Sequence, residues 1–136
     1  MSASPPRPTS DRPLIGISMG DPLGVGPEVI VKTLADPILR SRARFLVFGL
    51  HDVLEVAADQ AEISCFWWRE PYDGTARVGT GVLAADFDEL QPVRCNGTRG
   101  PDALAGHASF RFVEEGARHL HGGAIDALVT APICKQ

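Results

Sequence analysis

The sequence predicts an α/β fold in which a largely parallel sheet is flanked by helices. Short, nearly unbroken apolar runs, as at residues 14–19 and 44–48, are typical of strands buried on both faces. Helical patterns with apolar residues on one face, as at residues 51–59, alternate with these runs. Because strands that alternate with helices usually pair in parallel, the chain is assigned to the α/β class.

The amino-terminal unit is predicted to be a strand at residues 14–19, a glycine-rich loop at 20–26 and a helix at 27–35. Proline suits the first turn of a helix, because its missing N–H would be unpaired there in any case. Glu28 complements the positive end of the helix dipole. The helix is expected to end before the Asp-Pro pair that follows, because proline disfavours helical geometry in the preceding residue.

The remaining elements are predicted from periodicity and turn residues. Strands are expected at residues 44–48, 63–68, 82–87 and 125–130, helices at 51–59 and 109–121, turns at 69–80 and a long irregular loop at 88–105. Ser109 is the expected cap of the last helix. The apolar rhythm of that helix predicts these inner positions: Phe112, Val113, Gly116, Ala117 and Leu120.

Composition restricts the functional classes. With 44% hydrophobic and 22% charged residues, the chain has the balance of a globular domain. A net charge of −4 argues against sequence-independent binding of nucleic acid. Residues 1–13 are rich in proline and serine and are expected to be a disordered leader, followed by one α/β segment at 14–136. Three widely spaced cysteines and the absence of a signal-peptide core favour the cytoplasm.

The loop after the first strand carries the strongest chemical signal. Residues 20–28 contain three glycines, two prolines and two carboxylates. The dinucleotide fingerprint does not fit, because Val29 stands where its third glycine would be, and no Gly-Lys-Ser/Thr of a phosphate loop follows. Asp21 and Glu28 would repel a phosphate, so hydroxyls, a ribose, a nicotinamide amide or a metal-bound water are the expected neighbours. The alternative is a tight turn followed by a helix-capping glutamate.

A second loop is expected at the same edge of the sheet. Residues 130–135 leave the carboxyl end of the last predicted strand, as residues 20–26 leave that of the first. Ligands of parallel α/β sheets gather outside the carboxyl ends of the strands. The two loops are therefore predicted to form one shared site.

Three segments resemble one enzyme family. Residues 17–28 resemble the opening motif Met-Gly-Asp-Pro-Ala-Gly-Ile-Gly-Pro-Glu of the 4-hydroxythreonine-4-phosphate dehydrogenases of pyridoxal-phosphate biosynthesis, with Leu23 and Val25 in place of its alanine and isoleucine. Residues 106–115 resemble the family's Gly-x-Ala-Ser helix start, and residues 126–135 its Asp-Ala-Ile-Val-Thr-Ala-Pro-Ile-Asn-Lys block. The resemblance implies part of a two-domain fold like that of isocitrate and isopropylmalate dehydrogenases.

The resemblance also implies roles for individual residues. It implies cofactor-binding roles for five loop residues: Gly20, Asp21, Gly24, Gly26 and Glu28. It implies a substrate-binding role for Thr130, Pro132 and Cys134 and a catalytic role for Lys135. Each also has a structural interpretation, such as a strand-end hydroxyl for Thr130 or a solvated lysine for Lys135. Cys134 departs from the family's usual asparagine or histidine, which leaves the substrate open.

The implied activity is NAD-dependent oxidation, with decarboxylation, of 4-phosphohydroxy-L-threonine by a homodimer that holds a divalent metal (Zn, Mg or Co). The family's chains are more than twice as long as these 136 residues, and their three metal-binding histidines lie downstream of this segment. We therefore expect a segment truncated before the metal-binding part. The alternatives are a dehydrogenase of phospho-D-threonate or phospho-erythronate, and a non-catalytic remnant.

No metal site is expected within the 136 residues themselves. His119 and His121 are two positions apart on a predicted helix, so their side chains point in different directions. His51 and His107 have no ligand cluster near them in the sequence.

Overall fold

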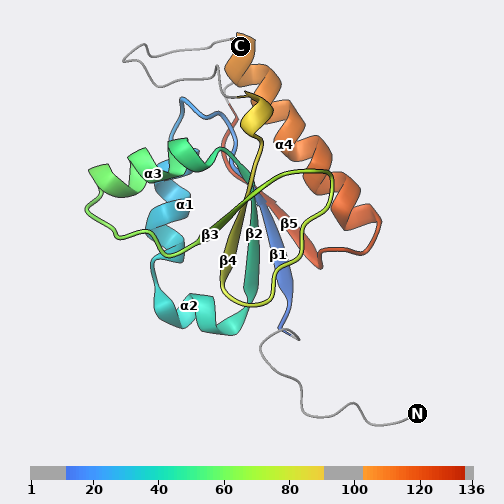
Figure 1. The fold of residues 1–136 in the computed structure, drawn as a ribbon, viewed down its shortest axis with the longest axis horizontal. Coiled ribbons are helices and arrows are strands. Elements are labelled where there is room, and N and C mark those ends of the chain that lie inside the picture. Colours follow the sequence, from blue (N-terminus) through green and yellow to red (C-terminus); the bar gives the residue numbers. More distant parts are fainter. Residues whose placement is uncertain (1–11, 91–102, 134–136) are drawn as a thin grey trace.

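A computed structural model describes residues 12–90 and 103–133 of the chain. These residues form a five-stranded sheet with helices on both faces (Figure 1). The strands are β1 (Leu14–Ser18), β2 (Arg44–Gly49), β3 (Trp68–Pro71), β4 (Val82–Asp86) and β5 (Ala127–Thr130). The helices are α1 (Gly26–Leu34), α2 (Pro37–Arg42), α3 (His51–Gln60) and α4 (Ala103–His121), with a short 3₁₀ turn, η2, at Asp88–Leu90.

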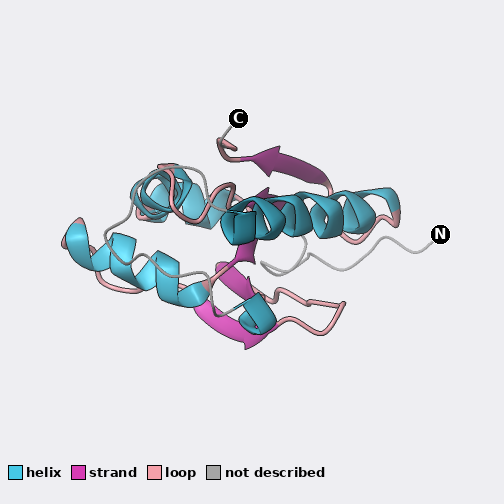
Figure 2. Ribbon diagram, turned by 90° about the horizontal axis from the view of Figure 1, so that it is seen from above, coloured by secondary structure: helices cyan, strands magenta, loops and turns pink. Residues whose placement is uncertain are grey.

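The sheet has the strand order β3-β4-β2-β1-β5, and each adjacent pair is parallel. Helices α1, α2 and α3 lie on one side of it and the long helix α4 on the other (Figures 1 and 2). The predicted parallel α/β architecture is therefore confirmed. Because β1 lies between β2 and the edge strand β5, the loop that follows it leaves the carboxyl edge beside the ends of both strands.

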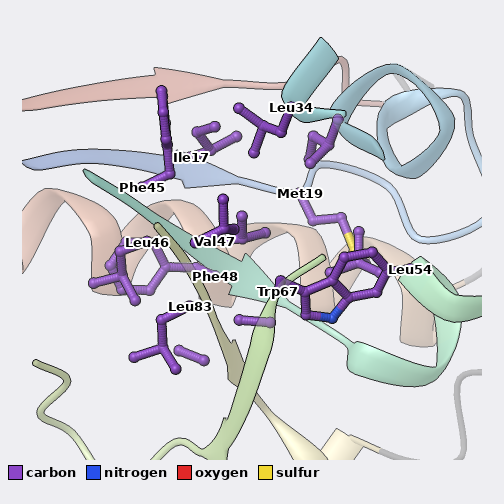
Figure 3. Close-up of a cluster of buried hydrophobic side chains, with 14 of the residues drawn as sticks. Ile17, Met19, Leu34, Phe45, Leu46, Val47, Phe48, Leu54, Trp67 and Leu83 are labelled. Atoms are coloured by element: carbon purple, nitrogen blue, oxygen red, sulfur yellow. The ribbon is translucent and has the colours of Figure 1, made fainter. Parts of the chain in front are cut away.

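The core fills both sides of β2. Leu46 and Phe48 are fully buried, and Phe45 and Val47 are almost so, which explains why this strand reads as an unbroken apolar run. Figure 3 shows these side chains together with Met19 and other core residues from neighbouring elements. Burial on both faces makes β1, β2 and β4 a rigid support for the loops at their carboxyl ends.

Most predicted elements are confirmed, but the third strand is displaced. Residues 63–67 are not in the sheet, and β3 comprises Trp68–Pro71, so it shares only Trp68 with the predicted strand and otherwise lies in the segment predicted as turns. The Trp67 indole is buried and its Nε1–H donates to Nδ1 of His51 on α3, at 3.0 Å. Trp68, by contrast, is 71% exposed on the edge strand. The apolar run at 63–68 thus packs partly against a helix, which strand periodicity does not reveal.

The start of the last helix was also placed wrongly. Helix α4 begins at Ala103, so the irregular loop predicted to reach residue 105 ends earlier, and Ser109 lies inside the helix instead of capping it. Its buried face comprises Ala108, Ser109, Phe112, Gly116 and His119, while Ala117 and Leu120 are exposed. A buried serine and histidine replace two of the expected apolar positions, which shifts the inner face around the helix.

Helix α2 was not predicted. Asp36 caps it, since its side chain accepts a hydrogen bond from the N–H of Ile38 at 2.9 Å, and Pro37 occupies the first turn. The Asp-Pro pair therefore separates two helices. The predicted leader at residues 1–13 lies almost wholly outside the described residues. Within residues 12–90 and 103–133, no helix combines the length and the hydropathy that a membrane span needs.

Candidate functional site

The loop after β1 and the segment after β5 lie against each other at the carboxyl edge of the sheet. The N–H of Ala131 donates to the carbonyl of Ser18 at 3.0 Å, which extends the pairing of β1 with β5 by one step. The N–H of Asp21 donates to the carbonyl of Pro132 at 3.2 Å. The two predicted loops therefore meet, although they are more than 100 residues apart in the sequence.

Two glycines make this contact possible. Gly20 has a φ of +79°, and a Cβ there would lie 2.3 Å from the Pro132 carbonyl oxygen. A Cβ at Gly26 would lie 2.2 Å from the carbonyl oxygen of Met19. The absence of a side chain at both positions lets the loop pack against the Met19 backbone and against the segment after β5. Gly24, in contrast, is exposed and has only ordinary contacts.

The two carboxylates of the loop are engaged within the protein. Asp21 is 5% exposed, and its Oδ1 accepts a hydrogen bond from the N–H of Leu23 at 2.9 Å. Glu28 is exposed and contacts Lys32 one helical turn later, at 2.6 Å. The hydrogen bond from Lys32 and the charge of Lys32 lower the pKa of Glu28. The charge of Glu28 is thus locally compensated, which weakens the expected repulsion of a phosphate.

Helix α1 begins at this edge, and no side chain of the described residues caps it. The first N–H groups of a helix have no partner within the helix, and they carry the positive end of its dipole. Val25 and Glu28 are exposed beside them. The start of α1 can therefore accept a carbonyl, hydroxyl or anionic group of a ligand.

Among the predicted substrate residues, Thr130 and Pro132 are exposed at the same edge. Thr130 pairs in register with Ser18, a residue that sequence reasoning missed. The Ser18 hydroxyl is fully buried and has no hydrogen-bond partner among the described residues. A serine at the end of an otherwise apolar strand was the available signal. Cys134 and Lys135 lie outside the described residues.

A polar cluster on the α4 side was also missed. The hydroxyl of Tyr72 donates to Glu115, and Arg118 binds both residues as well as the carbonyl of Gly74. Burial, together with the carboxylate of Glu115, raises the pKa of Tyr72 to about 12. Burial alone would raise the pKa of Glu115, but hydrogen bonds from Arg118 and Tyr72 outweigh it and lower that pKa to about 2. The cluster fastens the segment after β3 to helix α4.

One group of potential metal ligands exists in the described residues, contrary to the expectation for His51. The ligand atoms of His51, Asp52 and Glu55 lie within 4.8 Å of one another. The ring geometry opposes metal binding, however, because the lone pair of His51 Nδ1 accepts the Trp67 N–H. The proton of the neutral ring is then on Nε2, facing Glu55 at 3.5 Å. These residues therefore do not fit a metal ion.

A parallel sheet with two loops meeting at its carboxyl edge is an arrangement found in α/β proteins, which bind their ligands at that edge. Comparison with known proteins narrows this class. The chain is 35% identical over 131 residues to the 4-hydroxythreonine-4-phosphate dehydrogenase of Desulforapulum autotrophicum, and 37% identical over 125 residues to the D-threonate 4-phosphate dehydrogenase of Cupriavidus necator. These alignments cover 93% and 91% of the chain, and 37% of each relative.

Solved structures give the same relationship. The chain superposes on a 4-hydroxythreonine-4-phosphate dehydrogenase from Burkholderia phymatum with a TM-score of 0.75 at 33% identity, covering 91% of this chain and 37% of that one. The chain is thus a partial homologue of the 4-hydroxythreonine-4-phosphate dehydrogenase family, and it spans just over a third of the length of these relatives. No protein-family model matches it.

Proposed function

We propose that this chain forms part of an NAD-dependent dehydrogenase of a phosphorylated four-carbon hydroxy acid. One observation carries the proposal: the glycine loop at residues 20–26 and the segment after β5, which begins Thr130-Ala131-Pro132, contact each other at the carboxyl edge. The names of the relatives give the substrate class, since they include 4-hydroxythreonine-4-phosphate and D-threonate 4-phosphate dehydrogenases. Our primary assignment for the substrate is 4-phosphohydroxy-L-threonine, which is the same compound as 4-hydroxythreonine-4-phosphate.

The residues of the edge fit one part of a nicotinamide cofactor. The uncapped start of α1 offers N–H groups to the carboxamide or a ribose hydroxyl, and the exposed Gly24 leaves space beside it. Asp21 then holds the loop in shape through Leu23, because its carboxylate is already used there. Gly20 and Gly26 fix the approach of the loop to the second segment.

The substrate side of the proposed site is the segment after β5. In this proposal the hydroxyl of Thr130 donates a hydrogen bond to the substrate, Pro132 and Cys134 contact the substrate, and Lys135 binds its phosphate or carboxylate group as a cation. A bound NAD would accept the hydride from the carbinol carbon while the hydroxyl proton passes to solvent, and the resulting 3-keto acid would lose its carboxyl group as CO₂. A divalent metal would polarise the hydroxyl oxygen. The group of potential ligands at His51 does not fit that metal.

The alternative substrates are phospho-D-threonate and phospho-erythronate. The 37% identity to the enzyme from Cupriavidus necator and the replacement of asparagine or histidine by Cys134 favour this alternative. A non-catalytic remnant that binds nucleotide remains the alternative from a different class.

A substrate panel tests these proposals. NAD reduction is followed with each phosphorylated acid, using the 136-residue chain and, in parallel, the full-length Desulforapulum relative. In the relative, alanine is placed at the positions equivalent to Thr130 and Lys135. We expect kcat/KM to fall about tenfold or more at each position, because each removes a hydrogen bond or a charge from the substrate. Unchanged kcat and KM in both variants would show that this edge is not the substrate site.

A further inference from the structure

A groove separate from the proposed site runs between helix α3 and the connection that follows it. Its volume is about 630 Å³. Helix α3 contributes three carboxylates and Val56, and the connection contributes residues 63–65 and Trp67. None of these residues belongs to the two loops of the carboxyl edge. The groove therefore needs its own explanation.

The wall formed by α3 is acidic. Asp52, Glu55, Val56 and Asp59 follow the spacing i, i+3, i+4, i+7, which places them on one face of the helix. Glu55 faces His51, whereas Asp52 and Asp59 form no ion pair within the described chain. Asp52 also interacts with Arg69 at longer range, so the wall presents negative charge that the protein compensates only in part.

The opposite wall offers free peptide groups. Residues 63–66 run outside the sheet, and Ser64 and Cys65 are exposed. In the described part of the chain, the backbone N–H and C=O groups of Ser64 and Cys65 make no hydrogen bonds. Free peptide groups beside the apolar side chains of Val56 and Ile63 can pair with the backbone of an added extended segment.

We propose that this groove binds an extended, lysine- or arginine-bearing segment of a partner protein. The segment pairs its backbone with residues 64–65 and directs its cationic side chains toward α3. Alternate side chains of an extended strand are about 6.6 Å apart. The acidic residues of α3 are about 4.5 and 6 Å apart along the helix axis. The methylene stems of lysine or arginine cover Val56 and Ile63 while the charged ends reach the carboxylates.

A labelled peptide, Lys-Val-Lys-Val-Lys-amide, tests the proposal by fluorescence anisotropy with the 136-residue chain. The double variant Glu55→Gln, Asp59→Asn should bind the peptide at least about fivefold more weakly, since it removes two exposed charge partners. The control is Glu89→Gln, Glu114→Gln, which removes the same net charge near Arg111 on another surface. The control should keep the affinity of the unmodified chain.

Alkylation of Cys65, read by peptide mapping, supplies a second readout, because its exposed thiol lines the groove. The bound peptide should slow this alkylation. Three results would overturn the proposal: no binding of the peptide, equal weakening in both double variants, or unprotected Cys65. Displacement of the peptide by an equal concentration of spermidine would also overturn it, because the groove would then bind a polyamine through charge alone.

Discussion

At the scale of single residues, the shape of the carboxyl edge depends on two glycines that have no room for a side chain. Gly20 combines a positive φ with a close approach to Pro132, and Gly26 touches the backbone of Met19. A methyl group at either position must displace backbone atoms, which costs more than moving a flexible side chain.

We expect Gly26→Ala to lower the free energy of unfolding by about 2 kcal/mol or more. Gly79→Ala is the matched control, because a Cβ there meets nothing within 4 Å and the residue is exposed. The control should change the free energy of unfolding by less than about 0.5 kcal/mol. Urea titration followed by circular dichroism measures both, and equal effects would contradict the close packing at Gly26.

The Glu115 carboxylate predicts a defined dependence of stability on pH. Its pKa is about 2 in the folded protein, compared with an ordinary value of 4.5. Its stabilising contribution is therefore present above about pH 4.5 and is lost as the pH falls toward 2. Glu115→Gln should flatten this part of the stability curve, measured by thermal melts from pH 5 to pH 2. A curve identical to that of the unmodified chain would contradict the lowered pKa.

Tyr72 predicts a change of stability at alkaline pH. Its pKa is raised to about 12 from 10, so its contribution is present below pH 10 and is lost as the pH rises toward 12. In Tyr72→Phe, the loss of stability between pH 10 and pH 12 should be smaller than in the unmodified chain. A spectroscopic titration of the single tyrosine checks the pKa directly.

At the scale of elements, helix α4 provides the clearest test of where a helix begins. If Ser109 capped the helix, its replacement by alanine would cost about 1 kcal/mol. Because its hydroxyl is buried inside α4 and has no partner in the part of the chain that the structure describes, we expect Ser109→Ala to leave the free energy of unfolding unchanged or to raise it by about 1 kcal/mol. Asp36→Ala, which removes a true cap from α2, should lower it by about 1 kcal/mol.

Prediction from sequence succeeded where burial on both faces or a glycine-proline signal determines structure. Strands β1, β2 and β4 are apolar runs, and the start of α1 is marked by Pro27, so all four were predictable. Trp67 and Trp68 could not be assigned from their pattern, because one packs on α3 and the other is exposed. Ser109 looked like a cap because the local rule for helix starts does not report tertiary burial.

The arrangement of the candidate site was predictable only in part. The meeting of the two loops follows from the parallel topology, since adjacent strands end at one edge. The internal use of Asp21 and Glu28 did not follow, because the partners Leu23 and Lys32 offer several geometries that only the fold selects. Likewise, the buried hydroxyl of Ser18 and the Tyr72–Glu115 contact depend on packing between segments far apart in the sequence.

At the scale of the whole molecule, the two edges of the sheet differ. Strand β3 carries Arg69, Glu70 and Pro71, residues that discourage pairing with a further strand. Strand β5 has no charged residue, and Val129 on it is 53% exposed. We therefore predict self-association of the 136-residue chain through β5.

Val129→Lys should shift the chain toward monomer in analytical ultracentrifugation, because a charge on an edge strand opposes pairing. Thr33→Lys, which adds the same charge to an exposed position of α1, should leave the distribution unchanged. A monodisperse monomer of the unmodified chain would contradict the prediction.

The central claim is that the loop at residues 20–28 and the segment at residues 130–133 form one ligand-binding edge. Titration of NAD into the ¹⁵N-labelled chain, followed by amide chemical shifts, tests it most directly. Saturable shifts in both segments at NAD concentrations up to about 1 mM, with little change along α3, are the result that we predict. Shifts in only one segment, or none at this concentration, would contradict it.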